Sequence, residues 1–465
     1  MTATTVQQGQ GGRPTPLTFY QGTPGHRIYQ VLGWGFLVVP LLVLPYVLPG
    51  FRVSQMAQAI GWGVAILGMN LVIGYSGLIS LGHIAFTGLG AYLTATLINE
   101  SRWDMWMTLP VVFVACFLFG ALIGLPALKI KGLYLALVTL ALAYTFPILT
   151  KIEGGGIARR TGGDNGRTLS EVLAPPGWAE SLLGIGGKTP PEQEAIYKYA
   201  CFVVLALVCF GIVRNLMKSE PGRAMLAIRD NQIGAAVSGV DLNRHKVTTF
   251  AVSAGIAGIG GSMIAVVLNS VGPTSFDANY AILTLMGLVV GGVATQHGCW
   301  IGGLVVVFLQ DLAPRAVARF DVDVVYARAL FGVALVLIAF FAPGGIVSLA
   351  HKLKRKVVTV LPAVPDPSGA KAWVPAGAGR QAGATKAETK VDSLAAVGLA
   401  LGFVSLLLPF FAAPMITLIP AAGAVGLGVS RENSTSQGMS RGASVLGFFG
   451  LTIGIVAVLA KISPH

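Results

Sequence analysis

Charged residues are scarce in this sequence. Asp, Glu, Lys and Arg together make up 11% of its 465 residues, whereas soluble domains carry about 25% charged residues. Hydrophobic residues make up 54% of the chain and occur in many separate runs. This composition excludes a water-soluble globular protein and predicts an integral membrane protein that crosses the bilayer several times.

Acidic residues are scarcer than basic ones, which leaves a formal net charge of +13. A strong positive charge can indicate nucleic acid binding. Here, however, the basic residues fall between the hydrophobic runs, as they do in the cytoplasmic loops of membrane proteins. We therefore predict that the lipid bilayer surrounds the chain and that nucleic acid is not a partner.

Cysteine is rare as well, and the four present are Cys116, Cys201, Cys209 and Cys299. They form no CxxC pair and show no other metal-binding spacing. Cys201 and Cys209 stand about 12 Å apart along one expected helix, which is too far for a disulfide. We expect the cysteines to be small buried apolar residues, and we expect no metal site.

The first residues show no compact positive region followed by a short apolar core and a cleavage site of small residues, which are the features of a signal peptide. Residues 1–28 are polar and are expected to form a disordered cytoplasmic tail. Residues 29–351 form the predicted membrane core. Residues 352–392 are rich in Pro, Ala, Gly and Lys and read as a flexible cytoplasmic linker. Residues 393–465 are predicted to be a separate C-terminal transmembrane module of two or three helices.

The core is predicted to be an all-α polytopic membrane domain of about ten transmembrane helices, because each crossing needs about 20 apolar residues. The run Gly287–Gly303 is so rich in glycine that it could instead form two short helices around a break at Gln296–His297. The expected crossings are about 29–50, 54–73, 78–98, 106–128, 132–151, 196–214, 247–270, 280–296, 298–313 and 326–349.

Basic residues in the loops predict the orientation of these crossings. One cluster is Lys129 and Lys131, a second spans Arg214 to Lys246, and a third spans Lys352 to Lys356. All three clusters fall on one side if every crossing is counted. This side is therefore the cytoplasm, the N-terminus is cytoplasmic, and loop 152–195 lies outside.

Ionisable side chains are almost absent from the predicted crossings, although ion-coupled carriers usually place such groups at mid-membrane. The energy for any transport is therefore expected to come from a separate ATPase. The stretch LLGIGGKTP is not a phosphate-binding loop, because Leu182 stands where the pattern requires glycine. No catalytic set of side chains is found, so we predict neither enzymatic activity nor a cofactor in this chain.

The loop from Ser219 to Phe250 is predicted to be structured. Ser219 can cap a helix whose second residue is Pro221, and Gly239 marks the end of a second short helix. Arg223, Arg229 and Asp230 are expected to turn away from a buried apolar stripe. The stripe is predicted to consist of Ala224, Ala227, Ile228, Ala235 and Ala236. On these features alone, the loop could be an amphipathic connector at the membrane surface or a docking element for a cytoplasmic partner.

Four blocks resemble the LivM-type permease subunits of branched-chain amino acid ABC importers, and the resemblance covers about residues 29–352. The first and fourth are the most specific, because they include polar residues that two unrelated apolar sequences would not share. The blocks are GYSGLISLGHIAFTGLGAY at 74–92, LPALKIKGLYLALVTLALA at 125–143, TGGDNG at 161–166 and GRAMLAIRDNQIGAAVSGVDLNRHKVTTFAVSAGIAGIGGSM at 222–263.

This resemblance implies a subunit of the bacterial plasma membrane that works with several partners. They are a second, LivH-type permease, two cytoplasmic ABC ATPases that bind ATP and Mg²⁺, and an extracytoplasmic substrate-binding protein. The loop 219–246 aligns with the region that docks on the ATPase. The coupling residues are Gly222, Arg223, Ala227, Arg229, Asp230, Ala235, Ala236 and Gly239.

The chain departs from the family pattern at three places. Members often have Glu where this chain has Ala236, Glu near the outer end of the fifth crossing, where ALAYTFPIL is uncharged, and Gly-Pro where this chain has Gly298 and Cys299. The second departure lies on the expected substrate route and weakens the assignment of leucine, isoleucine and valine as ligands.

The small and polar residues of 74–92 predict a non-ideal, closely packed crossing of the kind that lines transport paths. His83 could be a buried structural histidine or a residue of the path, and no second metal ligand is spaced near it. The candidate pathway residues are Asn70, Ser76, Ser80, His83 and Thr87.

Together these features predict a permease subunit that moves branched-chain or other apolar amino acids. Two alternatives remain open: a permease for urea or short amides, because related permeases share these motifs, and a membrane scaffold that transports nothing.

Overall fold

The computed structural model describes residues 17–20, 43–127, 133–152, 157–169, 173–318, 344–348 and 358–361. The chain divides into two units, one comprising residues 44–349 and the other residues 1–43 with 350–465. The predicted C-terminal module lies outside the described residues, as do most of the tail, the linker and the crossings at 29–50 and 326–349.

In the unit that holds the two chain ends, β1 (Leu17–Tyr20) pairs in parallel with β4 (Val358–Leu361). Both strands are rich in β-branched and aromatic residues, which favour strands. Neither was predicted, because the tail and the linker were read from composition alone.

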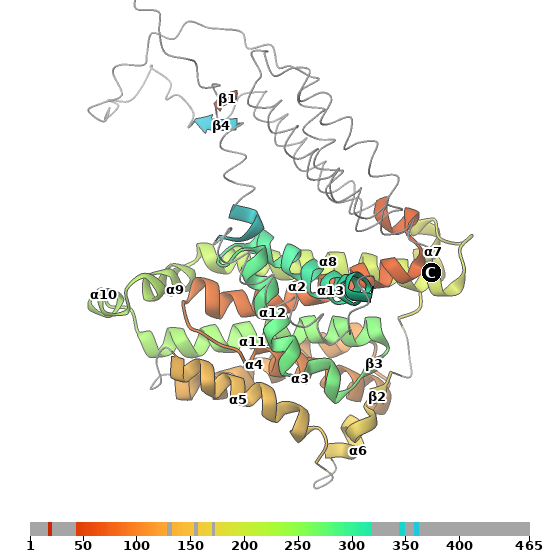
Figure 1. Cartoon of the computed structure of the whole chain (residues 1–465), viewed down its shortest axis with the longest axis horizontal. Helices are drawn as coiled ribbons and strands as arrows, with labels where there is room; N and C mark the ends of the chain where they lie inside the picture. Colours follow the sequence, from red (N-terminus) through yellow and green to blue (C-terminus); the bar gives the residue numbers. More distant parts are fainter. Residues whose placement is uncertain are drawn as a thin grey trace, which may run out of the picture. The chain divides into compact units, whose positions relative to one another are not determined.

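The larger unit is built from helices (Figure 1). Its long helices are α2 (Gly50–Asn70), α3 (His83–Ser101), α4 (Met105–Ala127), α5 (Leu133–Leu149), α8 (Pro190–Lys218), α11 (Leu242–Leu268), α12 (Ala278–Gly291) and α13 (Gln296–Ala318). The shorter elements are the π-helix η1 (Leu71–Tyr75), α6 (Ile157–Thr161), η3 (Gly163–Asn165), β2 (Arg167–Thr168), α7 (Gly177–Leu183), α9 (Glu220–Asp230), α10 (Gln232–Val237), β3 (Ser270–Val271) and η4 (Pro273–Phe276). The all-α prediction therefore omitted two short strand pairs.

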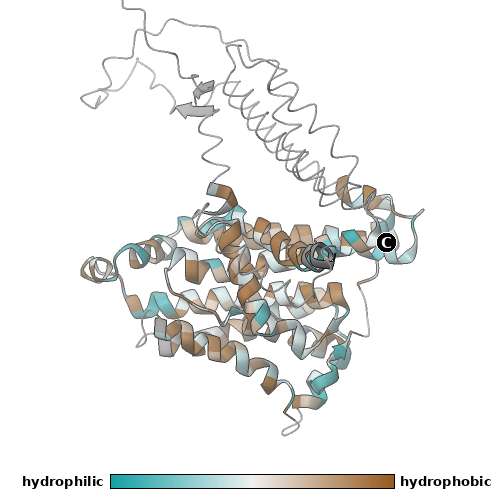
Figure 2. Cartoon of the chain, in the orientation of Figure 1, coloured by the Kyte–Doolittle hydropathy of each residue, from teal (hydrophilic) through white to brown (hydrophobic). Residues whose placement is uncertain are grey.

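Four helices of the described residues are long and apolar enough to cross a membrane: Gly50–Tyr75, Met105–Leu125, Pro190–Lys218 and Leu242–Leu268. Figure 2 shows the hydrophobic colouring along the long helices and the hydrophilic colouring around α6 and β2. These spans and the shorter apolar helix Tyr134–Leu149 lie where crossings were predicted.

Helix α2 forms the centre of the larger unit and packs against α8, α11 and α13. Within its most apolar window 89% of the residues are buried, compared with 33% in α4. Glycines permit the close contacts, since a Cβ at Gly68 would meet Ser253 and Ala257 of α11, and one at Gly303 would meet Ala59 of α2. Helix α2 is therefore shielded by protein.

Helix α4 has one buried and one exposed stripe. Val112, Cys116 and Gly120 are buried at helical spacing, whereas Val114 and Leu118 are exposed. Because the exposed stripe is itself apolar, it is suited to contact with lipid or with another apolar helix.

The glycine-rich run after residue 280 forms two helices, which is one of the two predicted alternatives. The break lies at Gly292–Thr295, slightly before the predicted Gln296–His297. Gly292 has φ 125° and Ala294 has φ 60°, so the backbone leaves the helical region here. Gln296 already begins the following helix.

Candidate functional site

His83 is the first residue of α3 and is buried, with 3% of its surface exposed. Its Nδ1 lies 3.0 Å from Ser80 Oγ, and its Nε2 lies 3.1 Å from Ser253 Oγ on α11. The Ser253 hydroxyl donates to the carbonyl of Phe250, so the Nε2–H of His83 donates to Ser253 and its Nδ1 accepts from Ser80. A neutral imidazole satisfies this network, which links the start of α3 to α11.

The other candidate pathway residues are buried too, but they do not converge on one point. Thr87 Oγ1 donates to the carbonyl of His83 one turn away. The Ser76 hydroxyl has no hydrogen-bond partner among the described residues. Of the five predicted residues, Ser80 and His83 are joined by a hydrogen bond between their side chains.

Asn70 binds the turn between α12 and α13. Its Oδ1 accepts from the backbone N–H of Ala294 at 2.9 Å, and its Nδ2 donates to the carbonyl of Thr295 at 3.1 Å. The side chain is fully buried. Asn70 therefore fixes the irregular turn to the last residue of α2, a role that the sequence did not suggest.

Among the described residues, no group of three or more His, Cys, Asp and Glu side chains could hold a metal ion.

Helices α9 and α10 lie together at one end of the larger unit, while α6, α7, β2 and β3 lie toward the other end (Figure 1). Helix α9 begins after Ser219 with Pro221 as its second residue, as predicted. The expected cap does not form, since no N–H of the first turn donates to the Ser219 hydroxyl, which itself donates to the carbonyl of Leu216. Gly239 follows α10 with φ 89°, which confirms that it ends the second helix.

The buried stripe of α9 and α10 differs in part from the predicted one. It consists of Gly222, Met225, Ile228 and Ala235, whereas Ala236 is exposed. Gly222 is buried because a Cβ there would meet the backbone of Leu216 and Met217 at the end of α8. Alanine is short enough to stand on either face, which made the predicted stripe ambiguous.

Helix α10 presents an apolar surface. Ile233 and Val237 stand one turn apart, with 78% and 85% of their surfaces exposed. The Asn231 side chain caps this helix by accepting from the N–H groups of Ile233 and Gly234. A capped short helix that exposes two large apolar residues is suited to insertion into a groove on a partner.

Arg229 is exposed, as predicted, but its side chain also bonds back to the protein. Its Nη1 donates to the carbonyl of Gly74 at 3.1 Å, and its Nε and Nη2 both donate to Asp230 Oδ1 at 3.1 Å. Amphipathic spacing places Arg229 on the polar face of α9, but a long side chain can reach back to a carbonyl that spacing alone does not reveal.

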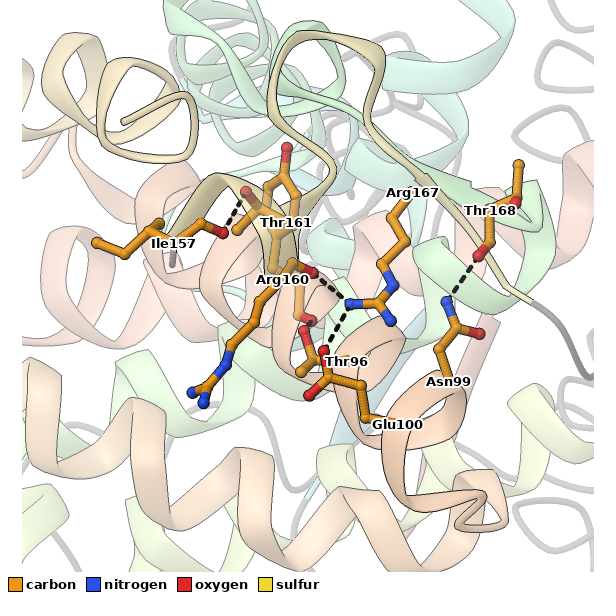
Figure 3. Close-up of polar contacts among 9 residues, drawn as sticks. Thr96, Asn99, Glu100, Ile157, Arg160, Thr161, Arg167 and Thr168 are labelled. Carbon is orange, nitrogen blue, oxygen red and sulfur yellow. Dashed lines mark hydrogen bonds and ion pairs between the residues drawn. The ribbon is translucent and has the colours of Figure 1, made fainter. Parts of the chain in front are cut away.

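The end of α3 away from His83 carries a second polar cluster (Figure 3). Arg167 of β2 pairs with Glu100 at 3.1 Å and also donates to the carbonyl of Arg160. Asn99 donates to the carbonyl of Thr168 at 2.8 Å. These contacts hold the segment around the TGGDNG block against the end of α3.

Lys198 was missed by the sequence analysis, although it lies within a predicted crossing. It is buried on α8 and contacts Glu194 Oε1 at 2.5 Å, the carbonyl of Val266 at 2.8 Å and Asn269 Oδ1 at 2.9 Å. The cation satisfies acceptors at the C-terminal end of α11, which explains how a charge is tolerated there.

A family model described as the permease component of branched-chain amino acid transport systems matches residues 52–339, more than half of the chain. The chain belongs to this family. The match runs from Arg52 in α2 through α13, and it therefore includes the His83 network, the Asn70 contacts and the α9–α10 pair.

Comparison of the chain with curated proteins agrees with the family match. The chain is 30% identical over 332 residues to the high-affinity branched-chain amino acid permease protein LivM of Escherichia coli K12. This similarity covers 69% of the chain and 76% of the relative. The chain is 28% identical over 340 residues to LivM of Salmonella typhimurium LT2, covering 71% and 78%. It is 26% identical over 260 residues to the ribose import permease RbsC of Haemophilus influenzae, covering 53% and 72%. No solved structure matches the chain significantly.

Proposed function

We propose that this chain is the transmembrane permease subunit of an ABC importer that carries branched-chain or other apolar amino acids across the bacterial plasma membrane. The observation that carries the proposal is the family match over residues 52–339, with LivM among the relatives. The helical structure and its apolar spans agree with a multi-pass membrane protein.

The proposed assembly contains a second, LivH-type permease, two cytoplasmic ABC ATPases and an extracytoplasmic substrate-binding protein. ATP and Mg²⁺ are bound by the ATPases, and this chain performs no chemistry and binds no cofactor. A probable LivH permease of Methanocaldococcus jannaschii is 25% identical to this chain over 304 residues, which supports a related permease as the second subunit.

The proposed topology has a cytoplasmic N-terminus, about ten crossings in the core and two or three more after the linker. In this orientation α9 and α10 face the cytoplasm, whereas α6, α7 and β2 face outward. The basic clusters described above support it, because Lys and Arg are retained on the cytoplasmic side.

Translocation is proposed to follow alternating access, in which closure of the ATPases moves helices around a path shared by both permeases. Asn70, Ser76, Ser80, His83 and Thr87 are proposed to belong to the segment beside this path. Their burial supports a role in holding the segment together, because a broken helix in a membrane needs protein around its freed backbone groups.

The coupling residues are proposed to act through the α9–α10 pair. Ile233 and Val237 would insert into a groove of the ATPase, while Gly222, Met225, Ile228 and Ala235 hold the pair to the permease. Arg223, Ala227, Asp230, Ala236 and Gly239 lie on or beside this docking surface.

The docking proposal is tested with the double variant Ile233→Asp/Val237→Asp. Two carboxylates in an apolar groove must be desolvated, so the ATPase should be lost from the purified complex. The measurement is the amount of ATPase that co-purifies with the tagged chain. The matched control is Leu182→Asp, since Leu182 is also apolar and is 77% exposed, but lies on α7.

The control should retain the ATPase at the wild-type level. Undiminished ATPase in the double variant would contradict docking through α10. A tagged wild-type chain that never retains an ATPase would instead favour the scaffold alternative.

A further inference from the structure

The end of α2 is an unusual piece of backbone. The helix widens into the π-helix η1, in which the N–H of Ser76 donates to the carbonyl of Leu71 at 3.1 Å. Helical structure resumes only at His83, and Gly77 has a φ of 69°. Isolated π-turns often occur at functional sites.

Helix α9 reaches this segment through Arg229. The guanidinium donates to the Gly74 carbonyl through Nη1, while Asp230 binds its Nε and Nη2 and so orients it. The side-chain stem packs on Gly77, where an added Cβ would lie 2.7 Å from Arg229 Cγ. Carbonyls in the last turn of a helix have no partner within the helix, and Arg229 supplies one for Gly74.

The other side of the same segment touches the α12–α13 turn. Asn70 binds both the N–H of Ala294 and the carbonyl of Thr295. A Cβ at Gly74 would collide with Asn70 Oδ1 and would lie 2.6 Å from the Ala294 nitrogen. Gly74 therefore contacts Arg229 through its carbonyl oxygen and lies directly against the turn with its Cα.

We propose that Arg229 is a positioning residue, which transmits movement of the docked α9–α10 pair through the Gly74 peptide and Asn70 to the α12–α13 turn. This inference rests on the proposed function, because it requires an ATPase at α10. The turn is a suitable receiver, because Ala294 has φ 60°, a conformation that costs free energy for a residue other than glycine and depends on the contacts around it.

The variant Arg229→Gln tests the relay in the complete complex, reconstituted in proteoliposomes with both permeases, the ATPases and the binding protein. Glutamine is shorter and uncharged, so the bonds to Gly74 and Asp230 are lost while α10 remains intact. We expect the ATPase to co-purify and hydrolyse ATP, and the amount of leucine transported per ATP to fall by about fivefold or more. Arg229→Lys, which retains a donor, should recover part of this ratio.

The matched control is Arg214→Gln. Arg214 is an exposed arginine near the C-terminal end of α8, outside the loop 219–246. The control makes the same change from arginine to glutamine. The control should keep the wild-type ratio of leucine to ATP.

Amide hydrogen exchange provides a readout that does not depend on transport. Trapping the ATPases with ADP and vanadate should change protection of the peptide covering residues 288–299 in the wild-type complex. The Arg229→Gln complex should show no such change, whereas Arg214→Gln should respond like the wild type.

Two results would overturn the inference. One is a wild-type ratio of leucine to ATP in Arg229→Gln together with a normal exchange response at 288–299. The other is loss of the ATPase from the Arg229→Gln complex, which would make Arg229 a docking residue. Failure of the proposed function looks different, because the wild-type complex itself would then transport no leucine.

Discussion

His83 is held on both ring nitrogens, by Ser80 from the preceding segment and by Ser253 from α11. The residue type and its place in an apolar run were visible in the sequence, which is why structural and pathway roles were both considered. Its partner Ser253, 170 positions away, could not be predicted, because spacing within one helix says nothing about the helix packed beside it.

We predict that His83→Ala lowers the thermal unfolding temperature of the purified protein. The change removes the partner of the buried Ser80 hydroxyl, and an unsatisfied buried group costs about 1–3 kcal/mol. Ser253 keeps its bond to the Phe250 carbonyl but loses the bond that links it to α3. The control is His245→Ala, because His245 lies near the start of α11 and its side chain bonds to the Asp241 carbonyl within its own turn. Equal unfolding temperatures for the two variants would show that the His83 network does not hold α3 to α11.

At the scale of elements, α3 and α11 approach each other through small residues. A Cβ at Gly90 would meet the backbone of Gly258, and one at Gly261 would meet the Thr87 carbonyl. Thr94 also donates to Ser262 at 2.7 Å across the same contact. Such close backbone approach is a common way to pack membrane helices, since the bilayer offers no hydrophobic driving force between them.

Gly261→Leu is expected to separate α3 from α11 and to destabilise the fold, because overpacking typically costs about 1–3 kcal/mol. The measurement is the yield of monodisperse protein and its unfolding temperature in detergent. Gly211→Leu is the matched control, since Gly211 lies within α8 and has no atom within 4 Å of the added Cβ. A Gly261→Leu protein as stable as the control would refute close packing at this contact.

Several elements could be predicted from local sequence alone. The ends of α4 and α5 follow from runs of apolar residues, and the start of α9 and the end of α10 follow from Pro221 and Gly239. The break before Gln296 was placed late, because Ala294 adopts a left-handed conformation that its residue type does not favour. Asn70 holds that turn through N–H and carbonyl groups 224 and 225 positions away, which no local pattern reveals.

At the scale of the whole molecule, the larger unit, residues 44–349, carries a different surface feature at each of its two ends. One carries α10 with its exposed Ile233 and Val237, and the other carries the Arg167 cluster beside α3 (Figures 1 and 3). Between them, α2 lies shielded among α8, α11 and α13. The exposed apolar residues of α10 are where the proposed ATPase would dock.

The specificity of such an assembly is expected to depend largely on the separate binding protein. The sequence supported a transporter of apolar amino acids through its blocks at 74–92 and 222–263, and the family match over 52–339 agrees with it. The uncharged ALAYTFPIL stretch of α5 weakened the assignment of leucine, isoleucine and valine as ligands. Urea and short amides stayed open as alternatives because related permeases share the same motifs.

The most direct test of the central claim is uptake of labelled leucine by proteoliposomes that contain the complete wild-type complex, with labelled urea measured in parallel. The account predicts leucine uptake that requires ATP, the binding protein and this chain, with no urea uptake. Urea uptake without leucine uptake would keep the transporter class but contradict the proposed substrate. ATP hydrolysis without uptake of either solute would contradict the claim that this chain forms a path for them.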